Sequence, residues 1–166
     1  MSLLTDEAPL VRSAEAAEID RLARLWYDGW QDAHAAILPA ELARYRTLES
    51  FRERLQAALS TVRVIDGREG LAGLCMIKGD ELYQLYVAAH ARGTGIAAAL
   101  IADAEARLTA AGVALAWLAC AIGNERAARF YEKCGWRGAG NRTIPLDTPS
   151  GVFPLEVWRY EKRLRP

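Results

Sequence analysis

The amino-acid sequence predicts one α/β domain, residues 1–166, in which helices pack on a mixed sheet. Two helical patterns come first, and a strand hairpin follows them. The second half alternates strand, helix, strand and helix before two closing strands. With 166 residues, 52% of them hydrophobic, the chain can bury one substantial core. A second domain is therefore not expected.

The first two helices are predicted from apolar residues at helical spacing. The first begins near Ala16 and runs toward Pro39, which either ends it or starts its successor. Its apolar face consists of Ile19, Leu22, Ala23, Trp26 and Trp30. The second helix has an apolar face that consists of Leu48, Phe51, Leu55 and Leu59.

The first strands are short. Residues 9–12 are a candidate first strand, and residues 61–65 and 71–77 form a hairpin around a turn at residues 66–70. The stretch 81–87, Glu-Leu-Tyr-Gln-Leu-Tyr-Val, is rich in aromatic and aliphatic residues and predicts the next strand.

In the second half, a helix that follows residue 95 ends at Gly112, which suits a left-handed C-terminal cap. Residues 113–121 are nearly all apolar, which is typical of a central strand covered on both faces. Asn124 caps the next helix and Gly135 ends it. Residues 136–146 and 152–164 predict two strands that close the sheet as an antiparallel pair.

The glycine-rich stretch 92–97 lies at the junction between a strand and a helix. Gly93 and Gly95 lack the Cβ atoms that would block an anion, and the backbone N–H groups at a helix N-terminus favour negative charge. The spacing excludes a P-loop, since no Gly-Lys-Ser/Thr follows, and a dinucleotide fingerprint, since Ala98 stands in place of the third glycine. The stretch therefore predicts a phosphate cradle, with a simple chain turn as the alternative.

Arg92, Gly95 and Ala97 form an Arg-x-x-Gly-x-Ala pattern, which resembles the acyl-CoA pyrophosphate loop of the GCN5-related N-acetyltransferase (GNAT) family. Residues 124–137 resemble the second motif of that family. The resemblance is specific for residues 81–136, while the N-terminal third matches in outline. It implies a mixed, mostly antiparallel sheet flanked by helices, and acetyl-CoA as cofactor.

The resemblance also implies which residues bind the cofactor. The cradle would hold the pyrophosphate, and the strand backbone before it would pair with the pantetheine amides as an added strand does. The cofactor-binding candidates are Leu85, Tyr86, Val87, Arg92, Gly93, Thr94, Gly95, Ile96, Ala97, Asn124 and Tyr131.

Two catalytic residues are implied in the same way. Tyr131 matches the tyrosine that acts as general acid toward the leaving thiolate in many family members, although Phe130 and Tyr131 could also simply anchor a helix. Glu81 occupies the strand position where several members carry a carboxylate base, although solvent exposure alone would explain a charge there. Tyr83 is the next candidate for the base.

Trp26, Trp30 and His34 follow one another at intervals of four, so they share one helical stripe. Core packing explains this stripe as well as function does. In the family the N-terminal helices form the wall of the acceptor pocket, so these three residues and Tyr83 are the substrate-binding candidates. An aromatic wall would suit a cationic or flat apolar acceptor.

The expected function is transfer of an acetyl group from acetyl-CoA to a primary amine, that of a small molecule, by direct attack in a ternary complex. One alternative is a peptide or protein N-terminal or lysine acetyltransferase. Another is an acyl-CoA-binding module without catalysis. The sequence leaves the oligomeric state open, a homodimer included.

The charge balance and the cysteines restrict which binding partners, metals and cross-links we expect. Lys and Arg together equal Asp and Glu at 21 each, so no long-range field draws the protein to nucleic acid or a membrane surface. Cys75, Cys120 and Cys134 are widely spaced, which favours buried thiols over disulfides or a metal site. Residues 3–7 lack the basic and apolar regions of a signal peptide, so we expect a cytoplasmic protein.

Overall fold

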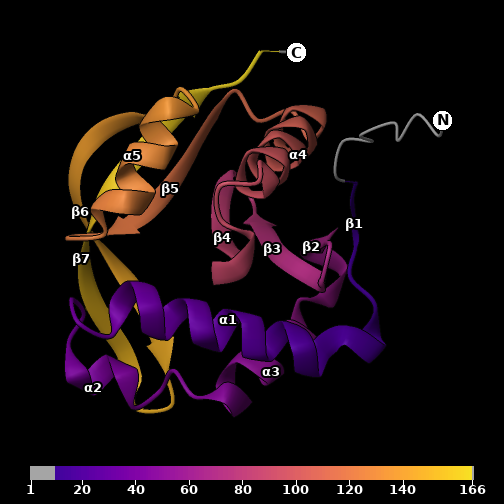
Figure 1. Ribbon diagram of the computed structural model, residues 1–166. Coiled ribbons are helices and arrows are strands. Elements are labelled where there is room, and N and C mark those ends of the chain that lie inside the picture. The colour runs from indigo at the N-terminus through magenta and orange to yellow at the C-terminus, as the bar shows by residue number, and fades with distance from the viewer. Residues whose placement is uncertain (1–9, 166) are drawn as a thin grey trace, which may run out of the picture.

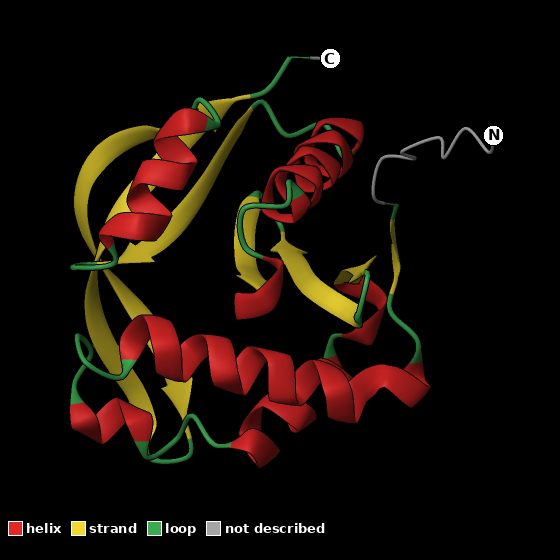
Figure 2. Cartoon of the chain, in the orientation of Figure 1, coloured by secondary structure: helices red, strands yellow, loops and turns green. Residues whose placement is uncertain are grey.

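The computed structural model describes residues 10–165, which form a seven-stranded sheet with helices on both faces (Figure 1, Figure 2). The strands follow the order β1-β2-β3-β4-β5-β7-β6, and among them only β4 and β5 pair in parallel. Their bounds are β1 (Val11–Ser13), β2 (Val62–Gly67), β3 (Gly70–Lys78), β4 (Glu81–Val87), β5 (Leu115–Ala121), β6 (Arg137–Thr148) and β7 (Gly151–Arg163). The expected mixed, mostly antiparallel sheet flanked by helices is confirmed.

The helices are α1 (Ile19–His34), α2 (Ala40–Ala43), α3 (Leu48–Ala57), α4 (Ile96–Ala110) and α5 (Glu125–Lys133). Single 3-10 turns lie at η1 (Ala16–Glu18), η2 (Leu59–Thr61) and η3 (Ala89–Ala91). Figure 1 shows α4 and α5 on one side of the strands and α1 to α3 on the other.

Most boundaries agree with the sequence patterns. Strand β4 covers the predicted residues 81–87, and Pro39 starts α2 as its N-cap after α1 has ended at His34. The hairpin turn is shorter than predicted, because pairing continues to Gly67 and resumes at Gly70. The first strand starts two residues later than residues 9–12 suggested, and Pro9 lies outside the described residues.

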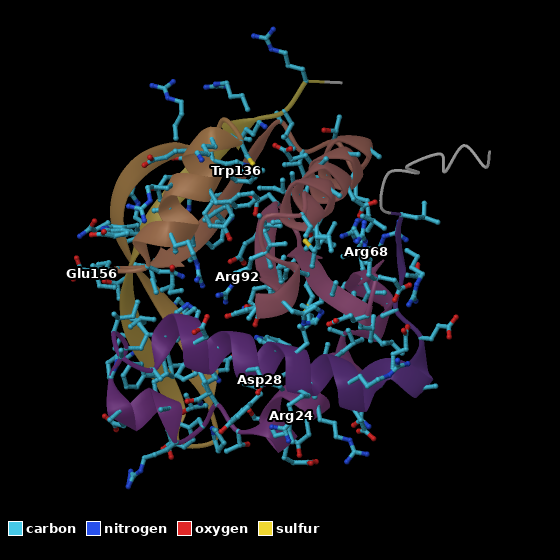
Figure 3. The ribbon with its side chains drawn as sticks, viewed as in Figure 1. Arg24, Asp28, Arg68, Arg92, Trp136 and Glu156 are labelled. Atoms are coloured by element: carbon cyan, nitrogen blue, oxygen red, sulfur yellow. The ribbon has the colours of Figure 1, made fainter. Side chains whose placement is uncertain are left out.

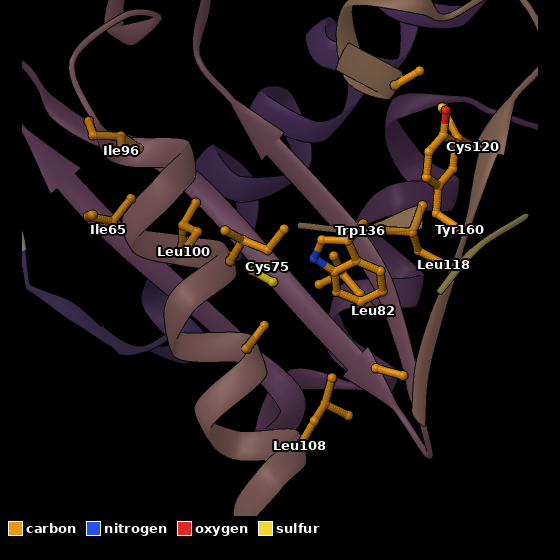
Figure 4. Close-up of a cluster of buried hydrophobic side chains, with 14 of the residues drawn as sticks. Ile65, Cys75, Leu82, Ile96, Leu100, Leu108, Leu118, Cys120, Trp136 and Tyr160 are labelled. Atoms are coloured by element: carbon orange, nitrogen blue, oxygen red, sulfur yellow. The ribbon is translucent and has the colours of Figure 1, made fainter. Parts of the chain in front are cut away.

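Two hydrophobic clusters hold the layers together, one on each face of the sheet. The first lies between the sheet and helices α4 and α5, where Leu100, Leu118 and Trp136 are almost fully buried (Figure 4). The second lies beneath α1 and α3, where Trp26 and Phe51 stack with ring centroids 4.7 Å apart. Burial of these large side chains removes most of their apolar surface from water, which is the main force that stabilises the fold.

Strand β5 differs from the prediction that both of its faces are covered. Ala116, Leu118 and Cys120 are buried toward α4 and α5, whereas Trp117 on the opposite face is only half-buried. That face is covered by the side chain of Arg159, whose guanidinium carbon lies 4.6 Å from the Trp117 ring centroid. The prediction was wrong because α1 and α3 pack over β2 to β4 and leave this face of β5 free for a cavity.

Strand β4 contains a β-bulge that controls which side chains face α1. Gln84 pairs with Met76 of β3 and Leu82 pairs with Ile77, so Tyr83 has no partner in the ladder. Strict alternation would place Tyr83 and Tyr86 on opposite faces. The extra residue brings both into the cluster beneath α1 and α3.

Strands β4 and β5 separate after a single paired position, Glu81 with Trp117. The edge of β4 from Leu82 to Val87 therefore faces an opening in the sheet, and this opening positions the candidate site. None of the helices in the described part of the chain is long and apolar enough to cross a membrane.

Candidate functional site

A cavity of about 490 Å³ occupies the opening between β4 and β5. Its wall contains residues from both faces of the sheet: Ala97, Phe130 and Tyr131 come from α4 and α5, and Trp26 and Trp30 come from α1. The cavity thus extends through the sheet. Its size is within the range of about 300–1,000 Å³ that is usual for ligand pockets.

The glycine-rich stretch lies at one end of this cavity and has the geometry of an anion site. Gly93 and Gly95 have φ of 76° and 83°, values that side chains other than glycine rarely adopt. Gly95 is the N-cap of α4, a helix of 15 residues whose first turn receives no side-chain cap. The N–H groups of that turn are therefore free to bind an anion, with the helix dipole in support.

All but one of the predicted cofactor-binding residues line this cavity: Leu85, Tyr86, Val87, Arg92, Gly93, Gly95, Ile96, Ala97, Asn124 and Tyr131. The exception is Thr94, whose hydroxyl donates a hydrogen bond to the Ala91 carbonyl. Asn124 caps α5 as expected, since its side-chain oxygen accepts a hydrogen bond of 3.3 Å from the Ala127 N–H.

Asp32 of α1 connects the cradle to two helices. Its carboxylate contacts Arg92 of the cradle loop, and it lies 3.4 Å from Arg126 of α5. Figure 3 shows Arg92 at the centre of the molecule, between α4 and α1. The hydrogen bond from Arg92 is the largest cause of the lowered pKa of Asp32, and the hydrogen bond from Arg126 is the next largest. Sequence analysis did not identify this cluster, because a lone aspartate on a helix carries no local signal.

Tyr131 lies on α5 between aromatic neighbours. Its ring centroid is 5.6 Å from that of Phe130, 6.3 Å from that of Tyr160 and 6.5 Å from that of Trp136. Burial among these side chains raises the pKa of Tyr131 above its ordinary value. The hydroxyl accepts and donates no hydrogen bond within residues 10–165, so it is available to a ligand in the cavity.

Glu81 lies at the start of β4, where the two strands still pair, and its side chain lines the cavity. Burial raises its pKa to about 7, an effect that the nearby Lys78 partly offsets. Glu81 is half-buried, whereas the alternative interpretation places its charge in solvent. A carboxyl with this pKa is about half ionised at neutral pH.

The predicted acceptor residues meet on the α1 side of the cavity: Trp26, Trp30, His34 and Tyr83. The Trp30 and His34 rings lie 5.6 Å apart, and the Tyr86 hydroxyl is 3.5 Å from His34 Nδ1. Burial lowers the pKa of His34 to about 4, so this imidazole is neutral at physiological pH. The Tyr86 ring can lie close to α1 because residue 29 of that helix is a glycine. An added Cβ at Gly29 would lie 2.5 Å from Tyr86 Cδ1.

The same wall contains two arginines that sequence analysis missed. Arg46 precedes α3 and Arg54 lies within it. The Arg54 guanidinium stacks over Trp26 at 4.4 Å and donates a 2.7 Å hydrogen bond to the Tyr83 hydroxyl.

The ends of β6 and β7 next to their hairpin turn complete the wall on the α1 side. They reach past α1 toward α2 (Figure 1), and Ile144, Leu146, Leu155 and Val157 face the cavity. Tyr45 and Ser150 join this hairpin to the loop before α3 through a 2.6 Å hydrogen bond between their hydroxyls.

Comparison with known proteins agrees with this geometry. Residues 19–136 match the family model described as the acetyltransferase (GNAT) family. An uncharacterized N-acetyltransferase of Mycobacterium tuberculosis is 36% identical over 117 residues, which are 68% of this chain and 72% of that protein.

Solved structures share the fold. A GCN5-related N-acetyltransferase from Rhodopseudomonas palustris superposes with a TM-score of 0.74 at 18% identity, over 95% of this chain and 96% of that one. The PaiA N-acetyltransferase from Thermoplasma acidophilum, solved in complex with coenzyme A, gives a TM-score of 0.65 at 19% identity, over 94% and 99% of the two chains.

The free N–H groups of the cradle fit the pyrophosphate of coenzyme A, and the unpaired edge of β4 fits the amides of its pantetheine arm. The matched region contains both features. The chain therefore belongs to the acetyltransferase (GNAT) family, and it is an N-acetyltransferase that uses acetyl-CoA.

Proposed function

We propose that this enzyme acetylates the primary amine of a small molecule, with Glu81 as general base and Tyr131 as general acid. The observation that carries the proposal is the cavity itself, because one continuous space is lined by Glu81, by Tyr131 and by the cradle at Gly95. An amine that enters on the α1 side and acetyl-CoA on the α4 side would meet in the opening between β4 and β5. This arrangement supports the proposal of direct transfer in a ternary complex.

Glu81 would prepare the acceptor. An amine arrives mostly as ammonium at neutral pH and cannot attack until it loses a proton. With its pKa raised to about 7, Glu81 is a stronger base than an ordinary carboxylate, and it is about half ionised at pH 7 and mostly ionised at pH 8. It takes the proton directly or through a water molecule.

Tyr131 would act at the end of the transfer. Bound acetyl-CoA supplies a thioester, from which the acetyl group moves to the amine and a thiolate leaves. Because burial raises its pKa, Tyr131 keeps its proton throughout the neutral range and holds it ready for that thiolate. Its hydroxyl is not engaged by another side chain of the described residues, which leaves it free for this task.

The wall on the α1 side supports a small acceptor. Helix α1, the loop before α3 and the β6–β7 hairpin surround that end, and the Tyr45–Ser150 hydrogen bond ties the last two together. A folded protein substrate would need a groove that is open along its length. The small-molecule proposal also keeps the expected cytoplasmic location, where acetyl-CoA and free amines are both present.

A thiol-release assay tests this proposal. Purified enzyme and acetyl-CoA are offered a panel of small primary amines beside a panel of peptides with free N-termini or lysines. Turnover of amines well above that of peptides is expected. A preference for peptides would favour an N-terminal or lysine acetyltransferase, and acetyl-CoA binding without turnover of either panel would contradict the small-molecule proposal.

A further inference from the structure

Arg46 is a buried charge without a partner. Only 8% of its surface is exposed, yet it lines the cavity on the α1 side. Its side chain makes no hydrogen bond and no ion pair with any residue from 10 to 165, and burial lowers its pKa. A guanidinium group has five N–H donors and normally pairs with a carboxylate or a phosphate when it is buried.

A second guanidinium, that of Arg54, lines the same cavity, and its positive charge adds to the lowering of the Arg46 pKa. Within residues 10–165 the Arg54 guanidinium contacts uncharged groups, namely the Trp26, Phe51 and Tyr83 rings and the Tyr83 hydroxyl. In the same wall Trp26 Nε1 is buried with no acceptor among the described residues.

Acidic groups of the wall do not balance this charge. Among the described residues, the only carboxyl group that lines the cavity is that of Glu81. The charges that affect Glu81 are those of Lys78, Asp80 and Arg159, and neither Arg46 nor Arg54 is among them. Burying the Arg46 charge beside a cavity that also contains the half-buried Arg54 is unfavourable unless an anion compensates it, and a ligand in the cavity can supply that anion.

We propose that the acceptor is an amine that also carries an oxyanion group, a carboxylate or a phosphate, which binds to Arg46 with Arg54 beside it. The inference rests on the proposed function, since it names the chemical class of the small-molecule acceptor. It fixes the direction of binding: the anion lies against α3 and the amine lies toward Glu81. It also disfavours diamines and polyamines, whose second positive charge would meet the two arginines.

The first test uses a ladder of ω-amino acids of increasing length, with amino alcohols and aminoalkylphosphonates of the same lengths. We expect kcat/KM to be higher for an anionic acceptor than for the amino alcohol of equal length. The carboxylate and phosphonate arms show which oxyanion is preferred. Equal rates for charged and neutral acceptors at every length would overturn the inference.

Substitutions test whether the preference for anionic acceptors depends on Arg46. Arg46→Met should lower kcat/KM for the preferred anionic acceptor about 10- to 100-fold, the usual loss for a hydrogen bond to a charged group. The loss of kcat/KM for the amino alcohol should be at least tenfold smaller than the loss for the anionic acceptor. Arg44→Met is the matched control, because Arg44 is an exposed arginine of the same loop that does not line the cavity. An equal loss for both substrate classes would mean that Arg46 is structural.

A binding measurement separates this inference from the proposed function. Calorimetry compares the binding of two anions that have no amine, 4-phenylbutyrate and 3-phenylpropylphosphonate, with the binding of the neutral 4-phenylbutanamide. Acetyl-CoA is present in each titration. We expect at least one anion to bind the wild type and Arg44→Met, and to bind Arg46→Met at least tenfold more weakly. If this holds while the wild type acetylates no amine, the anion site stands and the small-molecule function fails. Failure of both anions to bind the wild type better than the amide overturns the anion site alone.

Discussion

Burial shifts the pKa of two groups that line the cavity between β4 and β5 in opposite directions. It raises the pKa of the Glu81 carboxyl to about 7 and lowers that of the His34 imidazole to about 4. His34 is therefore neutral at working pH, but it is a weaker base than Glu81 and needs a pH near 4 to change charge. Glu81 is the better candidate for proton transfer, since an ideal catalytic pKa lies near the operating pH.

Glu81→Gln tests that role through pH. In the wild type the base must be ionised, so kcat/KM should fall as pH drops below about 7, where the buried carboxyl takes up its proton. The variant should lose about 10²- to 10⁴-fold at neutral pH and recover part of this as rising pH deprotonates the amine in solution. Acetyl-CoA binding should not change.

The measurement is a pH–rate profile of both proteins with a confirmed acceptor. Superimposable profiles would remove Glu81 from the mechanism. A uniform loss at every pH would assign it to positioning of the acceptor instead.

Tyr131→Phe separates catalysis from packing on α5. The ring and its contacts with Phe130 and Trp136 remain, and only the hydroxyl is lost. Loss of a positioned acid should lower kcat by about 10²-fold or more, while the Kd for acetyl-CoA stays within about twofold because the ring still fills its place. Steady-state kinetics and calorimetry give the two values, and an unchanged kcat would demote Tyr131 to a packing residue.

At the level of elements, the cradle depends on how α4 begins. Gly95→Val places a β-branched residue at a φ of 83°, and no atom lies within 4 Å of the new Cβ, so the valine extends into the open space of the cradle. We expect the Kd for acetyl-CoA to rise at least about 100-fold, as two charge-assisted hydrogen bonds of about 1.5 kcal/mol are lost.

Gly112→Val is the matched control for the cradle. Gly112 follows the other end of α4 with a φ of 85° and equally open surroundings. Both variants should therefore carry the same backbone strain of about 1–3 kcal/mol, and their thermal stabilities should fall alike. Only Gly95→Val should lose acetyl-CoA in calorimetry; a shared loss would attribute the effect to strain in α4.

The sequence predicted the positions of the helices and strands better than it predicted which side chains face which side of the sheet. Apolar spacing located α1, and turn residues located β4 between Gly79 and the cradle. It could not show the bulge at Tyr83, because a bulge is a mismatch between two strands and neither strand carries it alone. Tyr83 and Tyr86 both face α1 for that reason.

Arg46 and Arg54 were missed for a different reason. Arginines on and before a helix usually lie in water, and the sequence contains no local pattern that separates a solvated arginine from a buried one. Arg46 is buried and Arg54 is half-buried because α3 packs against α1 and the β6–β7 hairpin lies over the α1 side of the cavity. The cradle was found because its glycines are required by backbone geometry, which is local.

For the whole molecule, the sheet separates two routes to one reaction centre. The cradle and α5 lie on the α4 side, and the arginines, Trp30 and His34 lie on the α1 side. In the proposed mechanism each substrate occupies its own side while the other is bound. This arrangement favours direct transfer over a mechanism in which acetyl-CoA departs before the amine binds.

Cys120 provides the decisive test of that mechanism, because it is a nucleophile that lines the cavity and could in principle take the acetyl group. Burial raises the pKa of its thiol to about 11, so at pH 7 almost none of it is the reactive thiolate. We expect initial-rate plots against both substrates to intersect, Cys120→Ala to keep kcat within about threefold, and mass spectrometry to find no acetylated protein after incubation with acetyl-CoA alone. Parallel plots together with an acetyl group on Cys120 would instead show a covalent route, and the two sides of the cavity would then serve consecutive steps.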